Sequence, residues 1–230
     1  HAVKNLWPET KIAIGPAIKD GFYHDFDSPH TFVPEDIETI EKEMKRLVKE
    51  NADYKRREVS RVEAIELFEK KGETYKVELI KDMPEEEVIT IYESGDYLDL
   101  CAGPHLSRAG MVKAFKVMSL AGAYWKGDEK NKMLQRIYGT SFPKEKDLEA
   151  YLFRLEDAKR RDHRRLGKEL GLYSFVDEAP GFPVFHPKGM VLRNQIETFW
   201  RQCHARGGYD EVRTPLIMDR KLWERSGHWE

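Results

Sequence analysis

The helical segment that begins at about Glu145 changes character half-way along, and this change constrains the fold more than any other feature. Its first half carries an apolar stripe at helical spacing that includes Leu148, Leu152 and Leu155. Its second half, from Lys159 to Lys168, is strongly charged and almost free of apolar side chains. A helix without an apolar face is not covered by a core, so we expect it to bridge two separately folded parts. The sequence thus predicts two folded parts joined by a helix from Glu145 to Leu170, with the second part beginning after Tyr173.

The first predicted domain mixes helix and strand signals, which indicates an α+β fold with a mixed or antiparallel sheet. Apolar side chains at helical spacing predict a helix from about Pro34 to Glu50, and Ser60 with Glu63 forms a capping-box pattern before another helix. The tail of a helix is expected over residues 2–6 and short strands over 12–26. Longer strands are expected over 75–80, 88–92, 97–101, 115–123 and 133–138, and the second domain should hold a helix over 190–205 and a strand over 209–214.

Composition excludes several classes of protein. The formal net charge is -2, so the chain is not a globally basic nucleic-acid binder, and any contact with nucleic acid must come from local patches. The two cysteines, Cys101 and Cys203, do not make a secreted disulfide scaffold, which favours reduced thiols in a cytoplasmic protein. No apolar stretch approaches the roughly 20 residues of a membrane span, and no signal peptide is visible, so we expect no membrane partner.

The run from Asp99 to His105 carries the sharpest chemical signal. A strand is expected to end here in a Gly-Pro turn, which brings a carboxylate, a thiol and an imidazole around one point. Cys101 and His105 have a spacing compatible with two zinc ligands, although no second pair at ligand spacing is evident. The thiol can also be a nucleophile with His105 as its base, or simply a buried cysteine beside a hydrogen-bonded histidine. The spacing leaves these interpretations open.

Two further features have both an ordinary and a functional interpretation. Lys76 falls on an expected strand, where a lysine usually guards a solvated edge against aggregation. The run from Gly122 to Asp128 mixes aromatic side chains, a lysine and glycines. Such a run can stack a terminal nucleotide base, and it can equally form a packed turn.

Taken in order, six phrases of the sequence resemble the threonyl-tRNA synthetase family of class II aminoacyl-tRNA synthetases. The resemblance covers nearly the whole chain. The form Cys-x-Gly-Pro-His at Cys101 favours the threonyl branch, because related alanyl editing modules usually carry Cys-x-Gly-Thr-His. The six phrases are Lys11 to Pro16, Asp20 to Tyr23, Gly72 to Lys76, Asp99 to His105, Gly122 to Asp128 and Met133 to Thr140.

The resemblance assigns a role to each predicted part of the chain. Residues 1–140 correspond to the family's second N-terminal, or editing, domain without its first segment, and 141–171 to the linker. Residues 172–230 correspond to the opening of the class II catalytic domain, with Gly208 to Pro215 as its dimer-forming motif 1. The implied activities are ATP-dependent attachment of threonine to tRNA(Thr) and hydrolysis of mischarged seryl-tRNA(Thr). The implied partners are tRNA(Thr) and a second copy of the enzyme, and the implied cofactors of the longer enzyme are zinc and ATP with magnesium.

The resemblance also implies the site residues. The candidate catalytic residues are Lys76, Asp99, Cys101 and His105, which we expect to converge in one pocket, with Lys76 and Asp99 on strands of a shared sheet. Cys101 and His105 remain candidate metal ligands. The candidate substrate-binding or tRNA-binding residues are Tyr23, Tyr124, Trp125 and Lys126.

Two departures from the family pattern limit what these residues are expected to do alone. The family pairs its Cys-x-x-x-His element with a His-x-x-x-His element that falls before His1, and neither end of the chain looks like a natural terminus. The later motifs that bind ATP, and the ligands of the synthetic-site zinc, fall beyond Glu230. We therefore expect these residues alone not to form threonyl-tRNA.

Two other functions compete with this interpretation. A free-standing editing hydrolase of the alanyl type shares the motif region but has no need of the motif-1-like segment after Leu172. A non-catalytic tRNA-binding or regulatory module on the same fold is compatible with a missing His-x-x-x-His element.

Overall fold

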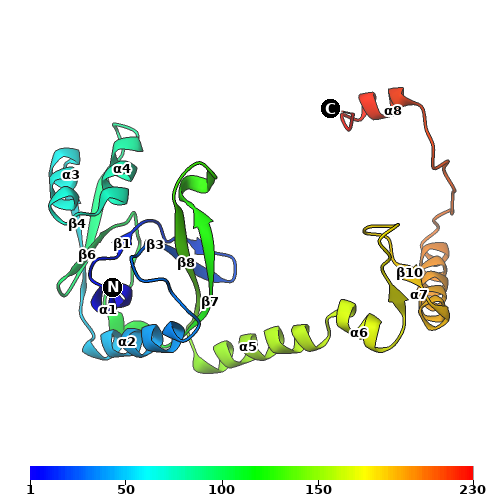
Figure 1. Ribbon diagram of the computed structural model, residues 1–230, viewed down its shortest axis with the longest axis horizontal. Coiled ribbons are helices and arrows are strands. Elements are labelled where there is room, and N and C mark those ends of the chain that lie inside the picture. The colour runs from blue at the N-terminus through cyan, green and yellow to red at the C-terminus, as the bar shows by residue number, and fades with distance from the viewer. Residues whose placement is uncertain (230) are drawn as a thin grey trace. The chain divides into compact units, whose positions relative to one another are not determined.

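The computed structural model describes residues 1–229. Its chain forms two compact units, His1–Arg154 and Leu155–Glu230 (Figure 1). The first unit contains every candidate catalytic residue. Within the described residues, no helix combines the length and the apolar character needed to cross a membrane.

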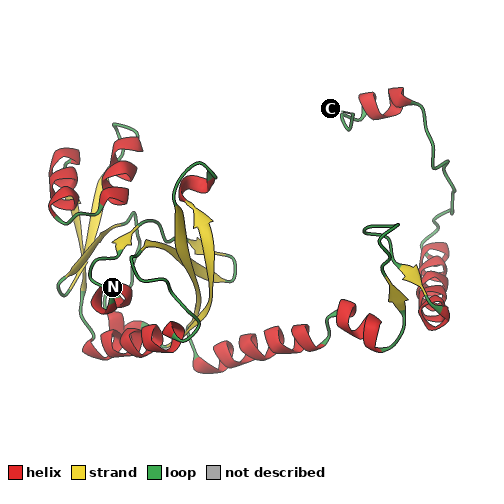
Figure 2. Ribbon diagram, viewed as in Figure 1, coloured by secondary structure: helices red, strands yellow, loops and turns green. Residues whose placement is uncertain are grey.

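The first unit is built around a five-stranded antiparallel sheet in the order β1-β3-β8-β7, with β2 also paired to β3 (Figure 2). The two long strands form a hairpin, so the strands expected over 115–123 and 133–138 are confirmed. The short strands expected over 12–26 are also present. The strands are β1 (Lys11–Ile12), β2 (Ala17–Ile18), β3 (Gly21–Asp27), β7 (Ala114–Tyr124) and β8 (Met133–Phe142).

Two helices pack against this sheet, α1 (Ala2–Leu6) and α2 (Asp36–Glu50). The apolar positions that predicted the second helix face a core that contains Phe26, Val117 and Ile137. This helix therefore forms for the reason that its sequence period indicated: one stripe of side chains leaves water on folding.

A smaller antiparallel sheet completes the first unit, in the order β4-β5-β6. Its strands are β4 (Tyr54–Val59), which was not predicted, β5 (Ile89–Ser94) and β6 (Tyr97–Leu100), and its helices are α3 (Arg61–Lys70) and α4 (Thr74–Asp82). Phe68, Ile80 and Ile91 form the centre of the shared core. The predicted cap is present, because Ser60 Oγ accepts a hydrogen bond from the Glu63 amide at 3.2 Å.

Helix α4 overturns the prediction of a strand over residues 75–80. The apolar run is short, and its pattern fits a helix as well as a strand. In the helix, Val77 and Ile80 face the core of the smaller sheet, while Tyr75 and Leu79 face Trp125 and Leu134 from the larger one. The side chains of a helix point in several directions, so one helix can contact both cores at once. A strand, whose side chains point only to two opposite faces, does this less well.

The remaining elements revise the predicted linker and second domain. The helix expected over 145–170 is divided into α5 (Glu145–Arg160) and α6 (His163–Glu169), because the Asp162 side chain accepts the Arg164 amide at 2.8 Å and caps a new helix. Helix α7 (Pro187–Arg206) confirms the helix expected over 190–205. The strand expected over 209–214 is wrong, since those residues have no regular structure. The other elements are β9 (Tyr173–Ser174), β10 (Val184–Phe185), α8 (Arg220–Arg225) and the short 3₁₀ turns η1 (Ala109–Met111) and η2 (Trp125–Gly127).

A buried ion pair ties the two central strands of the larger sheet together. Asp25 on β3 is only 2% exposed, and Arg136 on β8 donates to its carboxylate from Nε at 2.7 Å and from Nη2 at 2.8 Å. The guanidinium also lies 3.7 Å from the centre of the Tyr23 ring. Removing one partner of such a pair leaves the other buried without its counter-charge.

We predict that Asp25→Asn lowers the free energy of unfolding by roughly 3 kcal/mol, as expected for breaking a buried pair. Urea denaturation followed by circular dichroism measures the change. As a control, Glu38→Gln removes an exposed i,i+4 pair with Lys42 on α2 and should leave the midpoint unchanged. A loss below about 1 kcal/mol for Asp25→Asn would contradict this assignment of the pair.

Candidate functional site

Lys76 and Asp99 form an ion pair that is largely removed from solvent beside the motif residues. Lys76 lies in the first turn of α4 and is 4% exposed, and its Nζ lies 2.7 Å from Asp99 Oδ1 at the end of β6. The two are brought together by a helix and a strand that pack in one core, rather than by two strands of a sheet. An ammonium in such a place is stable only when a counter-charge and hydrogen bonds replace its lost hydration.

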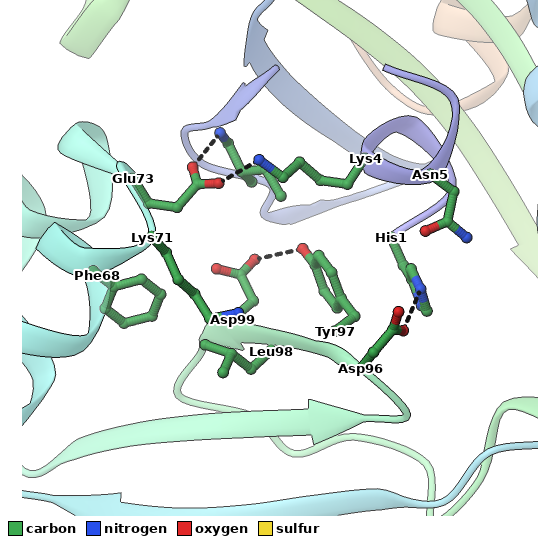
Figure 3. A pocket seen from close by; sticks show the side chains of 11 residues that line it. His1, Lys4, Asn5, Phe68, Lys71, Glu73, Asp96, Tyr97, Leu98 and Asp99 are labelled. Atoms are coloured by element: carbon green, nitrogen blue, oxygen red, sulfur yellow. Dashed lines mark hydrogen bonds and ion pairs between the residues drawn. The ribbon is translucent and has the colours of Figure 1, made fainter. Parts of the chain in front are cut away.

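The Asp99 carboxylate is held from two further directions. Oδ1 also accepts the Leu100 amide at 2.8 Å, and Oδ2 accepts the Tyr97 hydroxyl at 3.3 Å (Figure 3). Burial and the neighbouring Asp99 charge raise the pKa of Tyr97 well above its usual value, so its hydroxyl remains a donor. Sequence reasoning missed Tyr97, although its position two residues before Asp99 on a strand places both side chains on the same face.

Cys101 and His105 form a second pair, where the chain leaves β6. His105 Nε2 lies 3.1 Å from Cys101 Sγ, and the imidazole packs against the rings of Tyr54 and Tyr92, at 5.5 and 4.3 Å between centres. The turn between them depends on Gly103, whose φ is 74° and whose added Cβ would lie 2.1 Å from the Tyr92 hydroxyl. Burial lowers the pKa of His105, which favours the neutral imidazole.

The four candidate catalytic residues do not line a single cavity, contrary to the expectation of one pocket, and His105 lines neither of the two cavities beside the other three. Lys76 and Cys101 line a cavity of about 340 Å³, together with Gly15, Pro16 and Thr90. Asp99 lines another of about 260 Å³, with Lys4, Glu73 and Tyr97 among its walls (Figure 3). The four candidate catalytic residues are therefore arranged as two contacting pairs, with Lys76 linking Asp99 to the cavity of the thiol.

His24 on β3 is a second residue that sequence reasoning missed. Its pKa is lowered to about 4, chiefly by burial and then by the positive charge of Lys76, so the imidazole is neutral near pH 7. Its ring stacks on Phe26 at 4.7 Å and lies directly behind Gly15, where a Cβ would come within 2.2 Å of it. Alternation along β3 was the available signal, because it places His24 and Phe26 on one face and Tyr23 on the other.

The candidate binding residues occupy other places. Tyr23 contacts Arg136 and Tyr138, on the face of β3 opposite His24. Trp125 is 5% exposed, and both its indole and the Lys126 ammonium bind Glu78 of α4. Tyr124, at the end of β7, is 40% exposed, so it is the one of these three neighbours whose ring is open to a ligand.

The residues present do not fit a zinc site. Cys101 and His105 contact each other, but among the described residues no group of three or more histidine, cysteine or acidic side chains could hold a metal ion together. A closed zinc site takes four ligands and a catalytic one takes three from the protein. We therefore derive no chemical step from a metal at this pair.

Comparison with known proteins identifies the family. Residues 89–138 match the family described as "Threonyl and Alanyl tRNA synthetase second additional domain". The whole chain is 62% identical to a threonine--tRNA ligase of Syntrophomonas wolfei and 63% identical to one of Clostridium tetani. This chain belongs to the threonyl-tRNA synthetase family. It covers 36% of the length of each of these two relatives. The matched domain of this threonyl-tRNA synthetase segment includes Asp99, Cys101 and His105, whereas Lys76 and His24 lie outside it.

The half-buried His24 makes stability depend on pH in a defined direction. Its pKa is about 4 in the folded chain and about 6.5 when unfolded, so between these values the unfolded chain binds one more proton. We predict that stability falls as the pH drops from 6.5 to 4, with at most roughly 1.4 kcal/mol per pH unit due to this residue.

His24→Phe should keep the stacked ring and remove that part of the pH dependence. Urea denaturation at several pH values between 4 and 7 measures it, with His163→Gln on the exposed side of α6 as the control. Identical pH dependence in the wild type and His24→Phe would show that His24 is not buried as a neutral imidazole.

Proposed function

We propose that the first unit hydrolyses the ester of mischarged seryl-tRNA(Thr), as the editing part of an enzyme that attaches threonine to tRNA(Thr) with ATP. Family membership supports the substrate class. The observation that carries the proposal is the buried Lys76 ammonium, which is paired with Asp99 and borders the same cavity as the Cys101 thiol. A charged group kept beside a cavity at the cost of desolvation is typical of a functional site.

The need for such a reaction follows from the substrates. Serine lacks one methyl group of threonine, and a binding site can exploit a missing methylene for only about 1–3 kcal/mol. Accurate charging therefore requires a second step that removes serine after it has been attached. Hydrolysis of an aminoacyl ester needs a positioned water, a group that moves its proton, and a donor for the oxyanion that develops on the carbonyl.

The Lys76–Asp99 pair supplies charge of both signs. Lys76 Nζ can donate to the developing oxyanion, and its fixed pairing means that little reorganisation is needed as charge appears. The Asp99 carboxylate already accepts from Lys76, Leu100 and Tyr97. With about four acceptor positions on two oxygens, it keeps room for one more donor, which we assign to the ammonium of the seryl group.

The Cys101–His105 pair supplies a group for proton transfer. A neutral imidazole accepts a proton from water, and the lowered pKa of His105 favours that form. The nucleophile interpretation of Cys101 remains open, because His105 Nε2 also lies in position to take the thiol proton. Trapping of an acyl-thioester would favour the nucleophile over attack by water.

The rest of the proposal concerns the longer protein. We propose that residues 1–140, 141–171 and 172–230 act as editing domain, linker and start of a cytoplasmic class II catalytic domain that uses zinc and ATP with magnesium. Exposed apolar side chains support a homodimer contact after the motif-1-like segment, since Leu216 is 98% and Ile217 is 91% exposed. Tyr23, Tyr124, Trp125 and Lys126 were the expected tRNA contacts, of which we retain the exposed Tyr124.

We predict that Lys76→Ala slows deacylation of seryl-tRNA(Thr) by roughly 100-fold or more, measured with the full-length protein that carries this chain. The reason is the loss of the ammonium that we assign to the developing oxyanion. The control is Lys81→Ala, which removes an exposed lysine from the same helix. Threonine activation should be unchanged in both.

Lys76→Ala leaves the half-buried Asp99 carboxylate without its counter-charge, which can unfold the chain, so a second variant separates folding from chemistry. Lys76→Met with Asp99→Asn removes both charges and should fold while remaining inactive. Hydrolysis at the wild-type rate by either variant would exclude the catalytic role of Lys76. Binding of tRNA(Thr) with no hydrolysis by the wild type would favour the non-catalytic module, and hydrolysis of mischarged alanine tRNA would favour the alanyl-type hydrolase.

A further inference from the structure

One stripe of α4 faces away from the Asp99 carboxylate and toward the tip of the β7–β8 hairpin. Tyr75, Glu78, Leu79 and Asp82 follow one another at the i, i+3, i+4 and i+7 spacing of a helix face. Tyr75 and Leu79 pack with Trp125 in one buried cluster. This packing places the two acidic residues of the stripe, Glu78 and Asp82, next to the turn η2, which follows β7.

Glu78 receives two donors from that turn. Its Oε1 accepts the Trp125 indole N–H at 3.1 Å and also the Lys126 ammonium, which in addition binds Asp82. These hydrogen bonds lower the pKa of Glu78, first through Lys126 and then through Trp125, so the carboxylate is charged at neutral pH. The Glu78 carboxylate of α4 thus binds both the Trp125 indole and the Lys126 ammonium of the turn.

The turn is shaped to make these two contacts. Lys126 has φ 55°, in the left-handed region that side chains other than glycine rarely adopt, and Gly127 follows with φ 73°. The Trp125 carbonyl accepts Asn131 Nδ2 at 3.0 Å, which closes the turn on itself. A backbone conformation that is unfavourable by itself persists where surrounding contacts stabilise it. For Lys126 those contacts include the ion pairs of its side chain with Glu78 and Asp82 of α4.

The same helix is fixed at its beginning. The Tyr75 hydroxyl donates to Asp27 Oδ2 at 2.9 Å, and its ring meets the Trp125 ring edge-on at 4.9 Å between centres. Glu73 accepts the Ile12 amide at 2.8 Å and pairs with Lys4 at 2.7 Å. Lys76 lies between these attachments and the one made by Glu78, so the position of its ammonium depends on both.

We infer that Glu78 is a positioning residue, which anchors α4 on the β7–β8 turn through Trp125 and Lys126 and thereby places the Lys76 ammonium on Asp99. This role rests on the proposed function, because it concerns the reaction that Lys76 serves. It also gives the run from Gly122 to Asp128 a use other than nucleotide stacking, since the polar groups of Trp125 and Lys126 are engaged by α4. A displacement of about 1 Å in a reacting group can cost on the order of 100-fold in rate.

The test compares three changes on α4 in the full-length protein. Glu78→Ala should reduce kcat for deacylation of seryl-tRNA(Thr) by about tenfold with little change in KM, because substrate binding does not involve Glu78. Glu78→Gln should recover part of the rate, since the amide oxygen still accepts the Trp125 indole N–H. The matched control, Lys81→Ala, removes an exposed side chain of the same helix and should have no effect.

A double-mutant cycle separates positioning from a general structural effect. If Glu78 acts through Lys76, Glu78→Ala should cause no further loss of rate in a Lys76→Ala background. The inference would be overturned if the two substitutions reduced the rate of deacylation independently, so that the double variant showed the product of the two single losses. It would also be overturned if Glu78→Ala had the same rate as Lys81→Ala.

Hydrogen exchange gives a readout that does not need activity. Glu78→Ala should speed exchange of the α4 amides while leaving those of α2 unchanged, and Lys81→Ala should change neither. If the wild type fails to deacylate seryl-tRNA(Thr), the proposed function is wrong, and unchanged exchange in Glu78→Ala would show separately that the anchor is wrong.

Discussion

The Lys76 ammonium is largely withdrawn from water, and the groups that satisfy its charge come from a helix and a strand that pack in one core. Asp99 supplies the counter-charge, and the Leu100 amide and the Tyr97 hydroxyl hold the carboxylate at the required point. A buried pair of this kind gives little net stability, because desolvation offsets most of the attraction between the charges. In the proposed reaction its value lies in placing a fixed ammonium beside a cavity, where an ester carbonyl can accept a hydrogen bond from it.

Two imidazoles lie near that ion pair, those of the half-buried His24 and the exposed His105. The pKa of His24 is lowered to about 4 and that of His105 is also lowered, so two imidazoles face the site without adding positive charge. Lys76 and Asp99 place an ammonium and a carboxylate side by side at the site. This combination suits a substrate that presents a cationic amino group next to a carbonyl that becomes negative in the transition state.

The local pattern of apolar residues was enough to predict some elements of the fold but not others. Helix α2 and the hairpin strands β7 and β8 followed from apolar period alone, since each buries one face against one core. Helix α4 did not, because its side chains serve two cores and a turn some 47 residues away in sequence. Lys76 and Asp99 were connected by the family resemblance and not by spacing. Strand alternation could have indicated Tyr97 beside Asp99 and His24 beside Phe26, whereas the close approach of His24 to Gly15 depends on the folded structure.

The role of the Lys76–Asp99 pair can be tested by a crystal structure of the full-length protein with a hydrolysis-resistant analogue, in which serine is joined to the terminal adenosine by an amide. We predict that the seryl ammonium binds Asp99 and that the carbonyl oxygen lies within hydrogen-bonding distance of Lys76 Nζ, roughly 2.7–3.2 Å. Ligand bound in any other place, with the Lys76–Asp99 pair out of its reach, would contradict the assignment of this pair to the reaction.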